Sequence, residues 1–288
     1  MDSSDRGRFH PGNVLNDLTG KEWLQATRTW FVADSRRYHR NKDTELHPAR
    51  FPEEMCERFV TFFTKAGMWV LDPFAGSGST LMTCQETGRH AVGVEINPRY
   101  AATAHERRLA VETAAVVIQG DVQRAAEPAL WQPALAAGCP AVDGRPLFDF
   151  MLTSPPYFNM LRTSRGNVQS AQKDREAKGL DTWYSETPDD LGNIHDYDQF
   201  IAALGAAFDG LAPLLRPARY LVVVVQNLRT PDGVVRPLAW DLARRLSETY
   251  SFQGEQVWCQ NTKKLGIWGY PKVFVPNYHH HYCLIFRR

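Results

Sequence analysis

The sequence lacks the features that would place it in a membrane, outside the cell or around structural zinc. No apolar run approaches the roughly 18 residues that a membrane-spanning helix needs. Residues 1–6 are polar and are not followed by an apolar stretch, so they do not resemble a secretory signal. The five cysteines are scattered, without a Cys-x-x-Cys pair, which indicates a reducing compartment and argues against a zinc site. We therefore expect a cytoplasmic protein with no membrane partner.

A strong net charge is also missing. The 288 residues carry a formal net charge of +1, so the overall charge identifies no partner. Hydrophobic residues make up 43% of the chain and charged residues 23%, which are ordinary values for a globular protein. If nucleic acid is the substrate, the basic residues that bind it must be concentrated locally.

The sequence does contain strand-like apolar runs that alternate with helix-like segments. Successive runs end at Asp72, Glu95, Asp121 and Ser154. Alternation of this kind predicts a parallel sheet with helices on its faces. Because ligands of such sheets bind at the carboxyl ends of the strands, these four polar residues are expected to share one crevice.

The alternation resumes near the end of the chain. Helices are predicted over residues 196–215 and 237–250, and strands over 220–227, 252–259 and 281–286. Before residue 46 the chain is polar and irregular, apart from a short helix predicted over 21–29. We expect one domain over residues 1–288.

Two polar segments interrupt this pattern. Residues 158–195 leave the predicted sheet directly after Ser154-Pro155-Pro156-Tyr157, and long segments of this kind are usually functional or disordered. Residues 260–278 form a second loop with several aromatic residues. If nucleic acid is the substrate, both segments are candidates to contact it, and their candidate contacts are the basic residues Arg162, Arg165, Lys173 and Arg175 in the first and Lys263 and Lys264 in the second.

Three consecutive histidines, His279–His281, raise the question of a metal site. Neighbouring residues of a strand point to opposite faces, and no acid or cysteine ligand lies nearby in the sequence. No metal site is therefore predicted.

A pair of prolines ends the fourth strand-like run, at Pro155 and Pro156. Neither proline can donate to a strand ladder, so the chain must leave the sheet there. The carbonyls of Ser154 and Pro155 then lack ordinary ladder partners and can accept hydrogen bonds from a ligand. With the hydroxyl of Ser154 before them and the ring of Tyr157 after them, they suit a flat ring that carries an amino group. The alternative is a rigid turn without a function.

A glycine loop follows the first strand-like run, where residues 72–80 read Asp-Pro-Phe-Ala-Gly-Ser-Gly-Ser-Thr. Gly76 and Gly78 allow a tight turn and a close approach of a ligand. The loop lacks the lysine of a phosphate-binding P-loop and the third glycine of the dinucleotide motif. Glu95 nevertheless follows Gly76 by nineteen residues, at the end of the next strand, where an acid can bind both ribose hydroxyls. The loop therefore indicates a nucleoside cofactor without a dedicated phosphate site.

The glycine loop and the stretch Thr153-Ser154-Pro155-Pro156-Tyr157 together resemble the paired signature of S-adenosylmethionine-dependent DNA amino-methyltransferases. These enzymes methylate cytosine N4 or adenine N6. Residues 47–52 resemble the motif of this family beside the methionine part of the cofactor, and residues 280–287 resemble its closing strand. The resemblance implies an α/β, Rossmann-like class I methyltransferase fold, with a mostly parallel seven-stranded sheet, an antiparallel last strand and helices on both faces.

The resemblance also implies roles for individual residues. Asp72 would bind the methionine ammonium, Glu95 the ribose and Asp121 the adenine. The alternative for Phe74 is an aromatic residue of the core, and the alternative for Asp121 is an acid that belongs to a turn. The residues expected to bind S-adenosylmethionine are His47, Phe51, Asp72, Pro73, Phe74, Gly76, Gly78, Ser79, Thr80, Glu95, Asp121 and Thr153. The expected catalytic residues are Ser154, Pro155, Pro156 and Tyr157.

The implied reaction is direct transfer of a methyl group to an exocyclic amine. Ser154 Oγ and the Ser154 or Pro155 carbonyl would accept the hydrogens of the amine, and Tyr157 would stack on a base flipped out of duplex DNA. Within the family, serine at the first position of the motif favours cytosine N4 over adenine N6. The implied enzyme is a prokaryotic, nucleoid-associated N4-cytosine methyltransferase, with a restriction endonuclease as a candidate partner and a monomeric or homodimeric state.

Several alternatives stay open at this point. The nearest is N6-adenine methylation of DNA. RNA or protein amide methylation uses the same fold, but more often with Asn-Pro-Pro-Tyr. An inactive DNA-binding or regulatory protein on the same fold is an alternative of another class. The order of motifs, with the glycine loop ahead of the Ser-Pro-Pro-Tyr motif, also departs from the group whose glycine loop is most similar.

Overall fold

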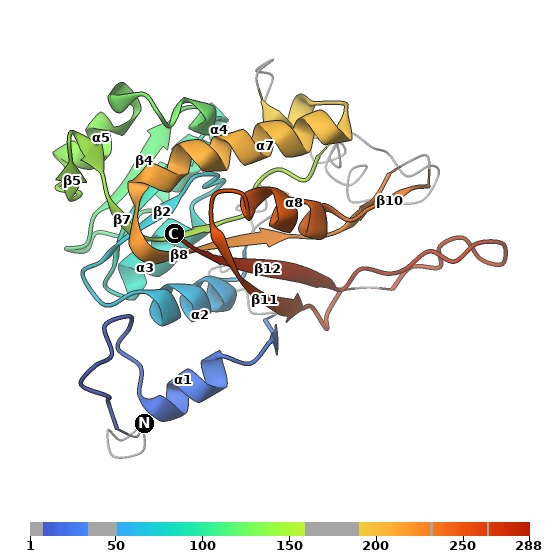
Figure 1. Cartoon of the computed structure of the whole chain (residues 1–288), viewed down its shortest axis with the longest axis horizontal. Helices are drawn as coiled ribbons and strands as arrows, with labels where there is room; N and C mark the ends of the chain where they lie inside the picture. Colours follow the sequence, from blue (N-terminus) through green and yellow to red (C-terminus); the bar gives the residue numbers. More distant parts are fainter. Residues whose placement is uncertain (1–7, 34–50, 159–189, 231–232, 264) are drawn as a thin grey trace.

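The computed structural model describes residues 8–33, 51–158, 190–230, 233–263 and 265–288. Its centre is an eight-stranded sheet with helices on both faces (Figure 1). The strand order is β1-β11-β12-β8-β7-β2-β3-β4. The strands in chain order are β1 Trp30–Val32, β2 Trp69–Asp72, β3 His90–Glu95, β4 Ala115–Gln119, β7 Phe148–Thr153, β8 Leu215–Val225, β11 Ser251–Cys259 and β12 His280–Arg287.

Every pairing in this sheet is parallel except those of β12, which lies antiparallel between β8 and β11. The expected mostly parallel sheet with an antiparallel last strand and helices on both faces is confirmed, and with it the Rossmann-like methyltransferase fold. β2 lies at the point where the strand order reverses, with β3 on one side and β7 on the other. Ligands of open α/β sheets bind at this point, outside the carboxyl ends of the strands.

The helices complete the layers on either side of the sheet. In chain order they are α1 Gly20–Ala26, α2 Glu53–Phe63, α3 Ser79–Glu86, α4 Pro98–Glu106, α5 Gln132–Ala136, α7 Tyr197–Leu211 and α8 Leu238–Leu246. Two small hairpins accompany them, β5 Ala141–Val142 with β6 Arg145–Pro146, and β9 Leu228–Arg229 with β10 Val235–Arg236. None of the described helices is long and apolar enough to cross a membrane.

Two hydrophobic clusters hold these layers together. Side chains of α2 and α3 pack with one face of the sheet in the first cluster. Side chains of α7 and α8 pack with the other face in the second. α2 shows how the sequence directs this packing. Pro52 occupies the position before the helix, Glu53 and Glu54 lie in its first turn, and Met55 and Phe59 lie at helical spacing on its buried side.

The structure corrects the expected elements in several places, and the strand expected over 220–227 is β8, which already begins at Leu215 and ends at Val225. Residues 30–32 were expected to be irregular, yet they form β1, which pairs in parallel with the outer edge of β11 and makes an eighth strand. A three-residue strand is too short to show a hydrophobic period. The helix expected over 196–215 ends at Leu211, because Leu215 already pairs with Phe148 in the sheet. The helix expected to reach residue 250 ends at Leu246.

Candidate functional site

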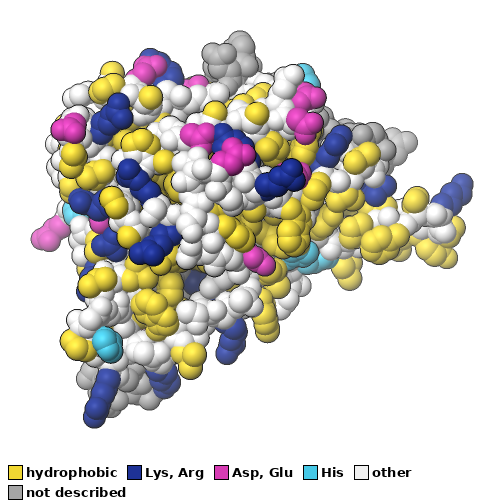
Figure 2. All heavy atoms as spheres, in the orientation of Figure 1, with side chains coloured by type: hydrophobic (Ala, Val, Ile, Leu, Met, Phe, Trp, Pro, Cys, Tyr) yellow, Lys and Arg dark blue, Asp and Glu magenta, His cyan; other side chains and the backbone are white. Residues whose placement is uncertain are grey.

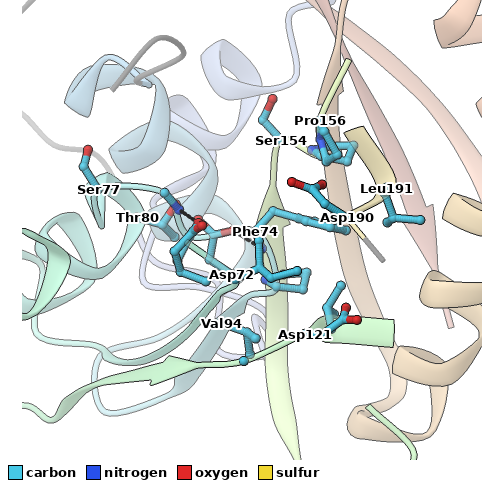
Figure 3. A pocket seen from close by; sticks show the side chains of 18 of the residues that line it. Asp72, Phe74, Ser77, Thr80, Val94, Asp121, Ser154, Pro156, Asp190 and Leu191 are labelled. Carbon is cyan, nitrogen blue, oxygen red and sulfur yellow. Dashed lines mark hydrogen bonds between the residues drawn. The ribbon is translucent and has the colours of Figure 1, made fainter. Parts of the chain in front are cut away.

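A pocket opens at the carboxyl edge of the sheet, where β2, β3, β4 and β7 end. One part of its wall is the glycine loop and the start of α3, and the opposite part is Ser154 and the two prolines (Figure 3). The lining residues are Phe51, Asp72, Pro73, Phe74, Ala75, Gly76, Ser77, Ser79, Thr80, Val94, Glu95, Ile96, Gly120, Asp121, Val122, Ser154, Pro155, Pro156, Asp190 and Leu191. The expected crevice shared by the four strand ends is therefore present.

The charged side chains in the described wall of this pocket all have one sign. Its described wall contains four acids, Asp72, Glu95, Asp121 and Asp190, and no lysine, arginine or histidine. A phosphate group would meet four carboxylates there and no basic side chain of the described wall. A cationic ligand with hydroxyl groups and a flat apolar part suits the wall better, because carboxylates attract cations and accept hydrogen bonds from hydroxyls.

Asp72 links β2 to β7 at the centre of the pocket through a hydrogen bond with Thr153. Its Oδ1 accepts hydrogen bonds from Thr153 Oγ1 at 2.7 Å and from the Phe74 amide at 3.2 Å. Burial raises the pKa of Asp72 to about 6, although the Thr80 and Thr153 hydroxyls and the Phe74 amide lower it. A cation beside this carboxylate would therefore favour its ionised form.

Glu95 connects the glycine loop to the end of β3 through hydrogen bonds. Its Oε2 accepts from the Gly76 amide and its Oε1 from the Asn97 amide, each at 2.8 Å. Burial raises the pKa of Glu95 to about 7, opposed by these two amides and reinforced by the charges of Asp72 and Asp190. Each carboxylate oxygen keeps a further lone pair, so the same group can accept ribose hydroxyls.

The two glycines of the loop have different roles. Gly76 has φ +52° and lines the pocket. Gly78 has φ +83° and lies outside the pocket wall, against α4. A Cβ at Gly78 would lie 3.0 Å from Ala104 Cβ. Gly93 on β3 is a third glycine of the site, and sequence reasoning missed it. A Cβ there would lie 2.7 Å from Ala75 Cβ, so Gly93 lets the loop pack closely on the sheet.

Ser154 is held by the end of the neighbouring strand β8. Its Oγ donates either to the Val224 carbonyl oxygen or to Tyr157 Oη, each 3.0 Å away. Tyr157 Oη also donates to the Val224 carbonyl, at 3.3 Å. The ring of Tyr157 is buried, lies outside the pocket wall and has its centroid 6.3 Å from that of His281. The next residue, Phe158, has φ +45°, which is unusual for a residue with a side chain.

Asp190 is a pocket residue that the sequence pattern did not single out. It caps the short 3-10 helix Leu191–Asn193 by accepting from the Gly192 amide at 2.8 Å, and only 4% of its surface is exposed. Figure 3 shows its carboxylate on the same side of the cavity as Ser154 and Pro156. Two acids, Asp189 and Asp190, end the long polar segment in the sequence, but no strand end marked Asp190 as part of the site.

Most of the expected site residues lie together in the pocket wall. Of the expected cofactor residues, Thr153 lies beneath the wall and bonds to Asp72, and Gly78 packs against α4. Phe74 both lines the pocket and packs against Phe208, with ring centroids 6.0 Å apart. Asp121 lines the pocket and also caps a 3-10 helix, so it is a turn acid, and its contact with the adenine of the cofactor stays a prediction.

Other expectations lie elsewhere or outside the described residues. Lys263 is exposed on the loop between β11 and β12. The described residues contain no cluster of three or more His, Cys, Asp or Glu side chains that could hold a metal ion. All five cysteines are free thiols. The expected site residues outside the described ranges are His47, Arg162, Arg165, Lys173, Arg175 and Lys264.

Comparison with known proteins points to one family. Residues 12–106 match the model of a family described as DNA methylase, N6_N4_Mtase. The Type II methyltransferase M.SmaI of Serratia marcescens is 45% identical over 73 residues, which cover 24% of this chain and 25% of that protein. M.HpaI of Haemophilus parainfluenzae is 39% identical over 67 residues, or 23% of this chain and 21% of that protein. M.BglII of Bacillus subtilis is 35% identical over 68 residues, or 24% of this chain and 19% of that protein.

These matches span about a quarter or less of each relative. Together with the family model over residues 12–106, they support the resemblance to the N6/N4 DNA methylases, whose methyl donor is S-adenosylmethionine. They do not separate N4-cytosine from N6-adenine methylation. The acidic pocket fits this donor, because Asp72 and Glu95 can accept an ammonium group and ribose hydroxyls and no basic side chain of the described wall provides for phosphate.

Proposed function

We propose that residues 1–288 form one catalytic domain that transfers a methyl group from S-adenosylmethionine to the N4 amino group of a cytosine flipped out of duplex DNA. One observation carries this proposal. Two buried acids, Asp72 and Glu95, and the neutral acceptors of Ser154-Pro155 face the same cavity. A cationic methyl donor and a flat amine can therefore occupy one pocket, with the reacting atoms close together.

Asp72 and Glu95 would hold the donor. The Asp72 carboxylate would bind the methionine ammonium, and the Glu95 carboxylate would accept from the ribose hydroxyls. Asp121, which also lines the pocket, would accept from the adenine amino group. When bound, the donor supplies an electrophilic methyl group on a sulfonium.

Ser154 would orient the amine that receives the methyl group. Since its hydroxyl donates to the Val224 carbonyl or to Tyr157 Oη, the lone pairs of Oγ point elsewhere and can accept a hydrogen from the amine. The Ser154 or Pro155 carbonyl would accept the second hydrogen. Both contacts draw the nitrogen lone pair out of conjugation with the ring and stabilise the positive charge that develops on nitrogen. The methyl–sulfur bond breaks as the methyl–nitrogen bond forms, and one amine proton then leaves.

Asp190 supplies the charge that Ser154 lacks. A serine hydroxyl is neutral and a weak base, so Ser154 cannot itself take the proton released from the amine. The Asp190 carboxylate lies on the same side of the cavity and is buried, where its charge acts strongly on a nearby cation (Figure 3). It would stabilise the methylated amine and receive its proton.

Tyr157 would contact the flat face of the target base. Its hydroxyl and that of Ser154 both lie within hydrogen-bond distance of the Val224 carbonyl, so the position of the ring is coupled to that of the hydroxyl. In our proposal the ring stacks on the flipped base, which requires it to become accessible from its buried position.

Serine at this position supports cytosine N4 over adenine N6 through the family resemblance, and adenine N6 is the second candidate target. The similar proteins are named Type II methyltransferases. A restriction endonuclease that cuts the unmethylated site is therefore a proposed partner in the same cell.

The substrate class is tested by offering the protein methyl-labelled S-adenosylmethionine with duplex DNA, RNA and protein extract in separate reactions. We expect label in duplex DNA only. Label in RNA or protein alone would contradict the proposal. Cofactor binding by calorimetry without any transfer would instead indicate a binding protein on the same fold.

A further inference from the structure

Residues 260–263 and 265–279 belong to an arm that projects from the body of the protein (Figure 1). The arm connects the carboxyl end of β11 to the start of β12. β11 runs in the same direction as β2, β3, β7 and β8, because it and β8 are both antiparallel to β12. The arm therefore leaves the sheet at the edge that carries the pocket. A limb of about ten residues can span at most about 35 Å.

Internal hydrogen bonds hold the two limbs of the arm together. Asn277 Oδ1 accepts from the Gly266 amide at 2.9 Å and from Trp268 Nε1 at 3.1 Å, and Asn277 Nδ2 donates to the Gly266 carbonyl at 3.0 Å. At the tip, the Lys272 and Val273 amides both donate to the Gly269 carbonyl at 2.8 Å. The arm thus has a defined turn at its end.

The outer part of this arm exposes large apolar side chains. Ile267 is 87% exposed, Phe274 86% and Tyr270 82%, and Leu265 and Val273 are also exposed. Figure 2 shows hydrophobic side chains along the arm with a basic side chain at its end. Water-exposed apolar groups contribute nothing to folding, and clusters of them mark interaction sites.

The charge of the arm indicates which partner it contacts. Residues 260–279 include three lysines, at positions 263, 264 and 272, and no aspartate or glutamate. A second copy of the arm would bring like charges together, which is unfavourable. The anionic backbone of a nucleic acid has the opposite charge, and apolar and aromatic side chains can enter its base stack.

We propose that the arm inserts its apolar tip, with Ile267, Tyr270 and Phe274, between base pairs of the DNA substrate while its lysines contact the phosphates. This inference rests on the proposed function. A base that moves into the pocket leaves a gap in the duplex, and an apolar wedge beside that gap stabilises the open form. The arm and the pocket lie at the same edge of the sheet, so one duplex can meet both.

Duplex unwinding provides a test that needs no knowledge of the recognition sequence, because a side chain inserted between base pairs lowers the helical twist. Relaxed plasmid is incubated with protein and topoisomerase I, the protein is removed, and the change in linking number is divided by the amount of protein bound. We expect Ile267→Ser combined with Phe274→Ser to reduce unwinding per bound protein by at least about fivefold. Both side chains are exposed, so the thermal midpoint should not change.

Two further variants separate the wedge from the charge. Lys263→Gln with Lys272→Gln should weaken plasmid binding and reduce the dependence of log K on log salt by about 2. Leu24→Ser is the matched control, since Leu24 is 75% exposed on α1, outside the arm. It should match the unaltered protein in both assays.

The outcomes distinguish this inference from the proposed function. If the unaltered protein methylates DNA but does not unwind it, or if the Ile267/Phe274 variant unwinds it equally well, the arm is not a wedge and the proposed function stands. If that variant converts a dimer into a monomer in sedimentation while unwinding is unchanged, the tip binds a second copy and the inference is overturned. Absence of methyl transfer to DNA would overturn the proposed function itself.

Discussion

The two walls of the pocket are built in different ways. The wall of the glycine loop comes mainly from residues close in sequence, and backbone amides of the same βαβ unit donate most of the hydrogen bonds to Asp72 and Glu95. The wall of Ser154 depends on distant parts of the chain, namely the Val224 carbonyl of β8 and Asp190 after the long polar segment. The first wall carries acids that suit a cationic donor, whereas the second combines neutral acceptors with one acid. We infer that the first wall determines cofactor affinity and the second determines turnover.

Removal of the Ser154 hydroxyl should give the largest difference between the effect on turnover and the effect on cofactor affinity. Ser154→Ala deletes the acceptor that orients the amine, so we expect turnover to fall by about a hundredfold or more. Cofactor affinity should change by less than about twofold, because no cofactor contact is removed. Single-turnover rates and calorimetry measure the two quantities. Ser251→Ala, at the opposite end of the sheet, is the control, and near-normal turnover of Ser154→Ala would refute the assigned role.

Neutralisation of Glu95 should have the opposite pattern. Glu95→Gln keeps the shape of the side chain but removes the charge that would bind the ribose hydroxyls, so we expect cofactor affinity to fall by about tenfold or more. Turnover at saturating cofactor should stay within about threefold. Glu112→Gln, an exposed carboxylate in the loop before β4, should leave both quantities unchanged. Unaltered calorimetric affinity of Glu95→Gln would reject the contact.

Cofactor affinity should also depend on pH. Burial raises the pKa of Asp72 to about 6 and that of Glu95 to about 7. A bound ammonium and bound hydroxyls favour the ionised carboxylates, so binding lowers both pKa values. The cofactor therefore binds more weakly when the two acids are protonated. Affinity should therefore be highest above pH 7 and fall by about tenfold or more on going to pH 5.5. Calorimetry between these values measures it, and a flat profile would contradict the assignment of these acids.

A smaller effect is expected at Asp190. Asp190→Asn keeps an acceptor for the Gly192 amide but removes the negative charge beside the amine, so turnover should fall by about tenfold. The pH dependence of turnover should change as well, which a purely structural role would not cause. If Asp190→Asn lowers cofactor affinity instead and leaves turnover intact, Asp190 belongs functionally to the first wall.

The same difference between the walls explains how much of the site could be predicted from the sequence. Asp72, the glycine loop and Glu95 follow each other at fixed spacing, so local patterns predicted both their elements and their meeting at one edge. Thr153 was predicted as a cofactor residue, but its hydroxyl bonds to Asp72, across 81 positions of the chain, and no local pattern reveals such a contact. The contacts of Ser154 and Tyr157 with Val224 depend on the pairing of β7 with β8.

Features that depend on tertiary packing also could not be predicted from the sequence. Asp190 follows an irregular segment, so no period or strand end indicated that it lines the pocket. β1 forms because the outer edge of β11 is available for pairing, which is a property of the assembled sheet. The buried position of Tyr157 is decided by the packing of β7, β8 and β12 around it.

The identity of the methylated nucleoside tests the central claim most directly. Duplex DNA is incubated with the protein and methyl-labelled S-adenosylmethionine, digested to nucleosides and analysed by mass spectrometry, with Ser154→Ala in parallel. We predict labelled N4-methylcytosine from the unaltered protein and at most about one hundredth of that amount from the variant. Labelled N6-methyladenine alone would move the target to adenine, and DNA without labelled nucleoside would contradict the account.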